Sequence, residues 1–403
     1  MPERLPIVVA GGGPGGMCAA VALALQDIPV IVVEREPAFP LDLRAGSFHP
    51  PTVEMLDRLG VGEAMRGHGI KVPVWQIRDR HDGVVAEFDL GLLRNDTPYP
   101  YRLHIEQHRL TRFLGKRAQD LPDLDLRFST EFRSFEQRGD RVLVTIESPN
   151  GEETIEASFL VGADGGRSSV RKQTGVSFEG FTWPERYLVA SCVYDLGRHG
   201  FAMNAYIADP VEWAAVFKMP HDGPPGLWRL AFPIQPEVED GTALSLPFVR
   251  ERLDGFQPGL GNADIPYHSI YRVHQRVAAT FRNGRVLLMG DAAHINNPLG
   301  AMGLNSAVHD AMNLAEKLGE IVNGGADADA LLERYVRQRR GVTIEFVQAM
   351  SIRNKRLLEE RDPAVRKERL DELRGIAADP EEAYRHVLGT SMIASLRRAE
   401  AIE

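Results

Sequence analysis

A glycine-rich turn near the N-terminus constrains the fold of this chain more than any other feature of its sequence. Residues 11–16 read GGGPGG and satisfy the pattern G-x-G-x-x-G. The turn follows a short apolar run, Ile7 to Ala10, and precedes an alanine-rich stretch, Met17 to Gln26, which predicts a helix. Val30 to Val33 then repeats the strand pattern. Strand, turn, helix and strand in this order form a βαβ unit, whose parallel strands predict an α/β domain.

The same turn predicts a dinucleotide site, because each glycine has its own use there. Gly11 allows the tight turn, Gly13 lets backbone N–H groups approach a pyrophosphate, and Gly16 lets helix and strand pack closely. Glu34 ends the second strand, where an acidic side chain binds a pair of ribose hydroxyls. The candidate dinucleotide contacts are Gly11, Gly13, Pro14, Gly15, Gly16, Glu34 and Arg35. The alternative is a plain glycine-rich turn with a surface glutamate, and the motif alone does not distinguish NAD from FAD.

Composition and charge predict a soluble, mildly acidic protein. The chain has 403 residues, 43% of them apolar, and carries 47 basic against 56 acidic residues. The net charge of −9 comes with no block of like charge, which argues against a nucleic-acid surface. We expect no signal peptide and no membrane span. Only Cys18 and Cys192 occur, and neither C-x-x-C nor H-E-x-x-H is present, so we expect a cytoplasmic protein without a metal site.

The rest of the chain predicts an α/β domain interrupted by a second sheet. Helical spacing recurs at Pro51 to Leu59 and Arg109 to Leu121, whereas residues 187–276 alternate apolar and polar side chains, as an antiparallel sheet does. The α/β pattern returns at residues 285–321, and Leu331 to Glu360 predicts a long amphipathic helix. We therefore predict a discontinuous Rossmann-type domain (residues 1–71, 103–176 and 277–340), an inserted antiparallel-sheet substrate domain (72–102 and 177–276) and a C-terminal helical segment (341–403).

Two further motifs resolve the choice of dinucleotide by resemblance. Residues 160–171 read LVGADGGRSSVR and residues 290–294 read GDAAH. With the glycine turn, they make the chain resemble the FAD-dependent aromatic hydroxylases, such as para-hydroxybenzoate hydroxylase, hydroxyphenylpropionate hydroxylase and the aromatic polyketide hydroxylases. The resemblance covers residues 5 to about 340. It implies an FAD-binding domain with an inserted substrate domain.

The resemblance also implies roles for single residues. It places Glu34 at the adenosine ribose, Arg44 against the FAD pyrophosphate and Gln107 beside the ribityl chain. The remaining implied cofactor residues are Asp291 at a ribityl hydroxyl, and Asp164 and Gly165 serving both FAD and the nicotinamide nucleotide. Three of them have a simpler alternative: Arg44 as a solvated surface charge, Gln107 as a hydrogen bonder at a helix start, and Asp164 as a turn residue before glycine. His294 is interpreted as a packed histidine rather than a catalyst.

The segment after Asp291 is the candidate flavin-facing loop. Two glycines in Asn296 to Ala307 permit a backbone that lies close to a flat ligand, and a helix starting near Leu304 directs its positive end there. Backbone N–H groups around Gly303, Leu304 and Asn305 would stabilise the negative charge of a reduced flavin. Pro298 matches a proline whose carbonyl faces the substrate in relatives, whereas Asn297 departs from their pattern. The alternative is an ordinary glycine-rich loop and helix cap.

These features predict a single-component monooxygenase. The resemblance implies noncovalent FAD, reduction by NADH or NADPH, and an electrophilic C4a-hydroperoxide formed with O2, without a separate reductase. An electron-rich phenol or hydroxylated N-heteroaromatic ring is the expected substrate. The alternatives are a flavin-dependent halogenase or oxidase, although the W-x-W-x-I-P signature is absent, and a non-catalytic FAD-binding protein. The Arg/Glu face of the C-terminal helices is read as a solvated surface, with a homodimer contact as the second reading.

Substrate residues are predicted from the alternating strands. Gly200 to Met203 resembles the start of a substrate-domain strand in para-hydroxybenzoate hydroxylase, which would put Ala205 and Ile207 where that enzyme has its carboxylate-binding serine and arginine. On this alignment para-hydroxybenzoate should be a poor ligand. The pocket candidates are His49, Ala205, Tyr206, Ile207, Trp213, Phe217, Trp228 and Pro298. Each has core or surface packing as its alternative, because a strand points half its side chains away from any pocket.

Overall fold

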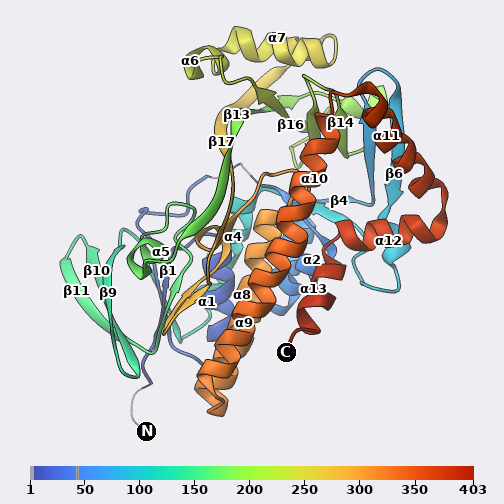
Figure 1. The fold of residues 1–403 in the computed structure, drawn as a ribbon. Coiled ribbons are helices and arrows are strands. Elements are labelled where there is room, and N and C mark those ends of the chain that lie inside the picture. The colour runs from blue at the N-terminus through green and yellow to red at the C-terminus, as the bar shows by residue number, and fades with distance from the viewer. Residues whose placement is uncertain (1–3, 42, 44) are drawn as a thin grey trace.

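A six-stranded, mainly parallel sheet forms the base of the molecule (Figure 1). The computed structural model describes residues 4–41, 43 and 45–403. The strands, in sheet order, are β18 (Arg282–Asn283), β19 (Val286–Leu288), β12 (Phe159–Gly162), β1 (Ile7–Ala10), β2 (Val30–Val33) and β8 (Leu124–Arg127). Only β18 runs antiparallel. The predicted βαβ unit is confirmed, with α1 (Pro14–Ala24) between β1 and β2, packed against α8 (Met302–Gly324) and α4 (Gln107–Ala118).

An eight-stranded, mainly antiparallel sheet stands above this base (Figure 1). Its strands, in sheet order, are β20 (His294–Ile295), β17 (Asp264–Ala278), β13 (Phe178–Val193), β16 (Leu227–Ile234), β15 (Ala214–Met219), β14 (Asn204–Ala208), β5 (Val74–Asp79) and β6 (Gly83–Asp89). The long strands β13 and β17 pair along most of their length and connect the two parts of the molecule. The α/β fold with an inserted antiparallel sheet is therefore confirmed.

The two faces of the eight-stranded sheet bury different cores. One face packs against α7 (Leu246–Phe256) and α6 (Asp240–Ala243), with Val249 and Leu253 of α7 in its core. The other face packs against Leu299 and the C-terminal helices, with Leu358 and Leu373 among its core residues. Because side chains alternate along a strand, neighbouring residues of β14 belong to opposite cores. This alternation decides which residues can reach a ligand.

The C-terminal helices return to the sheet. The predicted helix over 331–360 exists as α9 (Ala328–Val342) and α10 (Ala349–Leu358), joined without a break by a π-helical segment, Thr343–Gln348. Three further helices follow: α11 (Pro363–Ala378), α12 (Pro380–Thr390) and α13 (Ile393–Glu400). Asp362 and Asp379 cap α11 and α12 by accepting backbone N–H bonds. Helix α11 packs on β6, and α13 packs back on α9.

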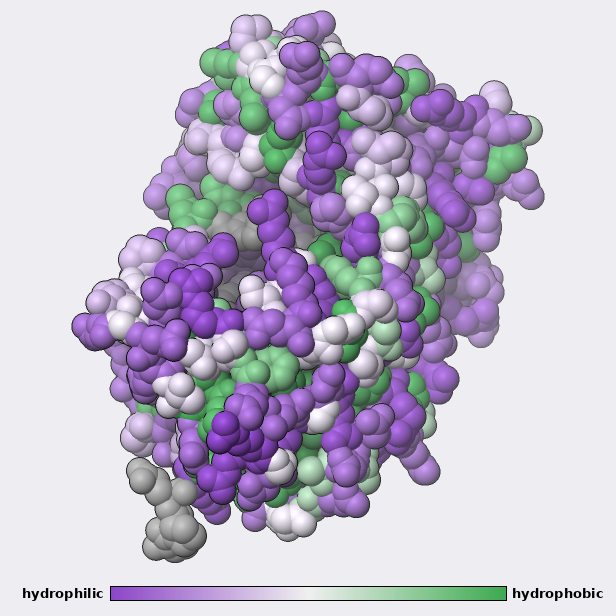
Figure 2. Space-filling view, turned by 60° about the vertical axis from the view of Figure 1, so that its left-hand side comes forward, coloured by the Kyte–Doolittle hydropathy of each residue, from purple (hydrophilic) through white to green (hydrophobic). Residues whose placement is uncertain are grey.

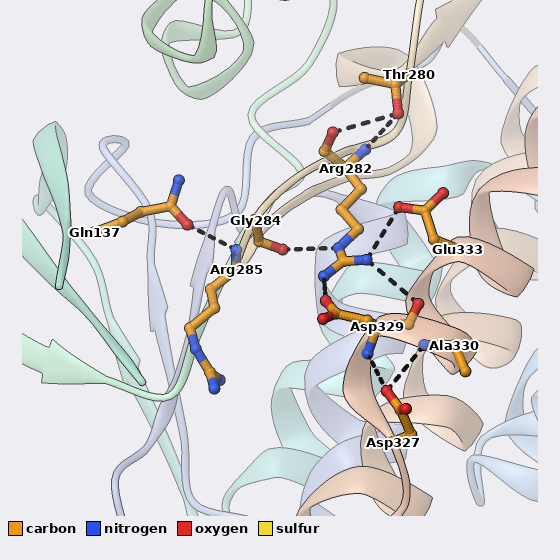
Figure 3. Close-up of polar contacts among 9 residues, drawn as sticks. All are labelled: Gln137, Thr280, Arg282, Gly284, Arg285, Asp327, Asp329, Ala330 and Glu333. Atoms are coloured by element: carbon orange, nitrogen blue, oxygen red, sulfur yellow. Dashed lines mark hydrogen bonds and ion pairs between the residues drawn. The ribbon is translucent and has the colours of Figure 1, made fainter. Parts of the chain in front are cut away.

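Smaller elements brace the two parts. A three-stranded sheet consists of β3 (Ser47–Phe48), β7 (Arg102–His104) and β4 (Ile70–Val72). Helix α2 (Pro50–Arg58) packs on β7, and α3 (Gly62–His68) packs on α2. A second one consists of β9 (Glu131–Arg138), β10 (Arg141–Ser148) and β11 (Gly151–Ala157). Figure 3 shows how the turn after β18 holds this sheet, since the Arg285 N–H donates to Gln137 Oε1 at 2.7 Å. Arg282 meanwhile pairs with Asp329 and Glu333 at the start of α9 (Figure 3).

The face shown in Figure 2 is mostly hydrophilic, with small hydrophobic patches and a hollow between the upper and lower parts. Within the described residues, no helix is long and apolar enough to cross a membrane. Those residues also contain no cluster of three or more acidic, histidine or cysteine side chains suited to a metal ion. Cys18 and Cys192 are both buried and unpaired, and burial raises the pKa of the Cys192 thiol to about 12.

Candidate active site

The phosphate turn has the geometry that a bound pyrophosphate requires. Gly11 has φ +109°, and a Cβ there would lie 2.5 Å from the Ala163 carbonyl oxygen. A Cβ on Gly16 would lie 2.0 Å from the Gly11 carbonyl oxygen. At Gly13, the N-cap of α1, a Cβ would meet nothing within 4 Å, and Pro14 occupies the first turn. The close approaches therefore lie on the protein side, and the helix N-terminus faces open space where a phosphate group fits.

Glu34 is fixed beside this turn at the end of β2. Its carboxylate accepts the N–H of Gly12 at 2.8 Å and the N–H of Glu36 at 3.0 Å, one through each oxygen. Each carboxylate oxygen can accept further bonds, so both remain able to bind ribose hydroxyls. Arg35 differs, because its side chain is 73% exposed and pairs with Glu36 on the surface. The structure thus places Glu34 beside the glycine turn and Arg35 on the surface.

Asp164 shapes the loop next to the turn. One carboxylate oxygen accepts from Ser168 Oγ at 2.5 Å, and the other accepts the N–H groups of Ser169 and Val170 at 2.7 and 3.1 Å. These bonds hold the start of α5 (Ser169–Thr174), and Gly165 turns the chain with φ +80°. Asp164 therefore fixes the loop whose backbone approaches Gly11, and its role toward FAD stays a proposal.

Three implied cofactor residues are placed less fully. Gln107 is the first residue of α4 and is buried. Asp291 lies in a short 3-10 turn, Gly290–Ala292, and is exposed. Arg44 lies outside the described residues. Their roles toward FAD stay proposals.

The flavin-facing loop is held by side chains from three directions. Gly300 and Ala301 have φ +108° and +56°, and α8 begins directly after them. Asn305 donates to the carbonyl oxygens of Ser47 and Ala301 at 2.9 and 2.6 Å and accepts the His49 N–H at 2.8 Å. Both N–H groups of the Asn305 side chain and one lone pair of its oxygen are thus used in bracing the loop. Backbone N–H groups at the start of α8 are what remains for a ligand, including those of Gly303 and Leu304.

Asn297, the residue that departs from the relatives' pattern, anchors a buried amide network. Its backbone N–H and its side-chain amide both donate to Gln275 Oε1 at 3.1 Å. Gln275 in turn donates to Gln348 Oε1 at 2.6 Å and Ser351 Oγ at 2.9 Å. The loop is therefore tied to the π-helical segment. The Pro298 carbonyl accepts the Ala301 N–H at 2.9 Å, so it has only its second lone pair for a substrate.

A cavity of about 440 Å³ opens beside this loop. Its wall on the sheet includes Trp75, Ile77 and Tyr206, its floor includes Gly300 and Met302, and its opposite wall comes from α10, α11 and α12. The Tyr206 hydroxyl accepts the Gly300 N–H at 3.2 Å, and His49 Nε2 contacts the Gly300 carbonyl oxygen at 2.8 Å. Burial lowers the pKa of His49 to about 3, so its ring is neutral at pH 7.

The predicted aromatic residues divide between the two faces of the sheet. Tyr206 and Trp213 belong to the core on the cavity side, and Phe217 packs against it. Ala205, Ile207 and Trp228 belong to the opposite core, against α7. These three side chains therefore point away from the cavity, because β14 directs Ala205 and Ile207, and β16 directs Trp228, to the α7 side of the sheet. The exclusion of para-hydroxybenzoate that rested on Ala205 and Ile207 loses its basis.

Sequence reasoning missed the most polar part of the cavity wall. Arg102 lines the cavity from β7, and Asn354 of α10 donates to the Leu299 carbonyl oxygen at 3.2 Å. His386 of α12 stacks on Phe88 with ring centroids 4.3 Å apart, and it also lines the cavity. The only signal for Arg102 was a charged residue between Tyr101 and Leu103, in a stretch that alternates polar and apolar side chains. Nothing in the helical pattern of residues 349–390 shows that these helices return to the loop.

The fold and site together define a two-part dinucleotide-binding protein with a ligand cavity where the Rossmann-type domain meets the second sheet. A family model described as an FAD binding domain matches residues 4–350. Para-nitrophenol 4-monooxygenase of Pseudomonas sp. (strain WBC-3) is 35% identical over 364 residues, which cover 89% of each chain. A 6-hydroxy-3-succinoylpyridine 3-monooxygenase of Pseudomonas putida is 32% identical over 90% of this chain and 91% of its own.

A solved structure shows the same architecture. The crystal structure of p-nitrophenol 4-monooxygenase from Pseudomonas putida superposes with a TM-score of 0.91 at 32% identity, covering 98% of this chain and 99% of that one. The chain therefore belongs to the FAD-binding family of flavoprotein aromatic hydroxylases, and it is an FAD-dependent monooxygenase. The resemblance inferred from the three motifs is confirmed.

Proposed function

We propose that this chain hydroxylates a small phenolic or hydroxylated N-heteroaromatic compound, using NADH or NADPH and O2 without a separate reductase. In the balanced reaction, a ring C–H, O2, NAD(P)H and H⁺ give a ring C–OH, water and NAD(P)⁺. The observation that carries the proposal is the cavity bounded by Gly300 on the flavin-facing loop and Tyr206 on the sheet. The names of the relatives, a para-nitrophenol 4-monooxygenase and a hydroxypyridine-type 3-monooxygenase, support these two ring classes.

The residues of this chain bind and orient rather than carry out covalent chemistry. Noncovalent FAD, when bound, supplies the electrons and the activated oxygen. Gly11, Gly13 and Glu34 would hold its adenosine diphosphate part, and the N–H groups around Gly303 to Asn305 would stabilise negative charge on its reduced ring. His49 and Tyr206 fix both polar groups of Gly300 and thereby the shape of the loop. The C-terminal helices cover the far side of the cavity and limit water there.

The test is flavin reduction by the purified protein alone. We expect anaerobic mixing with NADH or NADPH to bleach the bound FAD, faster when a substrate phenol or hydroxypyridine is present. Reduction only after addition of a second protein would contradict the single-component proposal. Oxidation of NAD(P)H that yields only H2O2 with every ring compound would favour an oxidase, and a halogenated product formed with halide would favour a halogenase. A flavoprotein that no nucleotide reduces would favour a non-catalytic role.

We also propose that the protein acts in the cytoplasm, in line with its two unpaired cysteines. For the charged faces of the C-terminal helices we propose a solvated surface, with a homodimer contact as the alternative. Sedimentation of the FAD-loaded protein distinguishes the two, because a dimer at micromolar concentration would contradict the solvated surface.

A further inference from the structure

Arg102 is a buried cation that pairs with no carboxylate among the described residues. Its side chain is 2% exposed, and Nη1 donates to Asn204 Oδ1 at 2.5 Å. The guanidinium lies 4.9 Å from the ring centroid of Trp75 and is hydrogen-bonded to the hydroxyl of Tyr206. Its Nε has no hydrogen-bond partner. An arginine stays protonated even when buried, so this positive charge is permanent.

The groups that face Arg102 do not neutralise it. They are His49, His104 and His386, with Tyr206 and Trp75. Burial lowers the pKa of His49 to about 3 and those of His104 and His386 to about 4, so none of the three adds charge at pH 7. Arg102 therefore brings a positive charge without a carboxylate partner to the sheet side of the cavity. The opposite wall, from α10 and α11, also carries charged side chains: Arg353, Arg356, Arg369 and Glu372.

Two more nitrogen atoms without partners lie in the same cluster. Trp75 Nε1 and His386 Nε2 are both buried and unbonded, and both residues line the cavity with Arg102. The Trp75 and His386 rings stack with centroids 5.8 Å apart. Buried polar atoms are almost always hydrogen-bonded, and a buried charge without a counter-ion is costly. A ligand that brings an oxyanion would satisfy both requirements.

We propose that Arg102 is the ion-pair partner of an oxyanion carried by the aromatic ring, and that this enzyme thereby selects ring compounds bound as anions. The proposal rests on the proposed function and adds the charge state of its substrate. Binding a phenol in this way releases its proton to solvent and leaves the ring more electron-rich. Such a ring is a better target for an electrophilic oxygen, so the charge of Arg102 would favour the reactive form without a protein base.

The test measures binding to the oxidised FAD-loaded protein without a nicotinamide nucleotide, so its outcome does not depend on turnover. Titration calorimetry compares 4-nitrophenol with 4-nitroanisole, a neutral molecule with the same ring, and with benzoate, whose oxyanion is a carboxylate. We expect 4-nitrophenol to bind at least about 10-fold tighter than 4-nitroanisole, and the visible spectrum of the bound ligand to be that of the phenolate. Benzoate binding would extend the oxyanion site to carboxylates, and absence of benzoate binding would restrict it to phenolates.

Arg102→Gln should weaken 4-nitrophenol binding about 10- to 100-fold, the range for loss of a charged hydrogen bond, and leave 4-nitroanisole unchanged. Arg102→Lys keeps the charge and should retain much of the preference. Arg78→Gln is the matched control, because Arg78 lies on β5 beside Ile77 but faces Phe201 and the Gly200 carbonyl on the other side of the sheet.

Equal binding of 4-nitrophenol and 4-nitroanisole by the wild type would overturn the proposal, whatever the variants do. An equal loss of both ligands in Arg102→Gln, or an effect of Arg78→Gln as large as that of Arg102→Gln, would also overturn it. If the binding results overturn the role of Arg102 but the protein still hydroxylates neutral rings with NAD(P)H, the proposed function stands. If the protein binds the phenolate but hydroxylates no ring compound, the role of Arg102 stands and the proposed function fails.

Discussion

At the scale of single residues, the phosphate turn shows how position decides the use of chemically identical glycines. Gly16 permits α1 to pass close to Gly11, whereas Gly13 faces open space at the helix N-terminus. The first meets a requirement of packing, and for the second we propose a requirement of the ligand. The motif predicted both roles from sequence, because the strand, turn and helix context fixes where each residue stands.

The two glycines should therefore respond differently to alanine. Gly16→Ala places a methyl group within contact of the Gly11 carbonyl and should lower the free energy of unfolding by about 3 kcal/mol or more. Gly13→Ala should change it by less than about 1 kcal/mol and yet weaken FAD binding at least about 10-fold. Urea unfolding of the apoprotein and FAD titration measure the two effects. Equal loss of stability in both variants would contradict this division.

Glu34 provides a second test of the same site. Glu34→Gln should weaken FAD binding by roughly 1.5 to 3 kcal/mol, the value of a hydrogen bond to a charged group. Glu36→Gln is the matched control, because Glu36 pairs on the surface with Arg35. An unchanged FAD dissociation constant for Glu34→Gln would remove Glu34 from the ribose site.

The buried histidines predict how stability depends on pH. The pKa of His386 falls from 6.5 to about 4, first through burial, so below pH 6.5 the unfolded chain binds a proton that the folded chain excludes. The stability that this neutral ring contributes is thus present above pH 6.5 and is lost as the pH falls towards 4. His386→Phe keeps a ring stacked on Phe88. When the pH falls from 7 to 5, the free energy of unfolding of His386→Phe should decrease by about 2 kcal/mol less than that of the wild type. If the free energies of unfolding of the two proteins change with pH in parallel, His386 does not cause the pH dependence.

At the scale of elements, the loop before α8 depends on partners far away in the sequence. The sequence predicted that this loop contains two glycines and is followed by a helix, and the structure contains both features. The phase of β14 could not be predicted, because an alternating strand gives no sign of which face meets the ligand; Ala205 and Ile207 lie in the core on the face away from the cavity. The amide network of Asn297, Gln275 and Gln348 was equally hidden, since it joins three elements that only the fold brings together.

This network should contribute strongly to stability. Gln275→Met leaves the buried N–H of Asn297 and the partners of Gln275 Nε2 unpaired, and should cost about 2 to 4 kcal/mol in unfolding free energy. Gln137→Met is the control, because Gln137 also bridges two elements but is exposed (Figure 3). It should cost no more than about 1 kcal/mol. Similar costs for the two variants would show that the network does not hold the loop.

At the scale of the whole molecule, the cavity is shared by three parts of the chain. The loop comes from the Rossmann-type part, Tyr206 from the eight-stranded sheet, and the outer wall from α10 to α12. Sequence patterns predicted the first two parts and their order. They could not predict that the C-terminal helices close the site, because the amphipathic pattern of a helix shows that it packs but not on what.

The most direct test of the account is the fate of dioxygen. The protein is incubated with FAD, NADH or NADPH, isotopically labelled O2 and a panel of phenols and hydroxypyridines. We predict that a ring compound which accelerates NAD(P)H oxidation is converted to a product with one new hydroxyl group, whose oxygen atom is labelled. The amount of this product should reach at most one molecule for each molecule of NAD(P)H consumed. A hydroxyl oxygen drawn from unlabelled water, or no hydroxylated product from any compound that accelerates NAD(P)H oxidation, would contradict the assignment of this chain as a single-component aromatic hydroxylase.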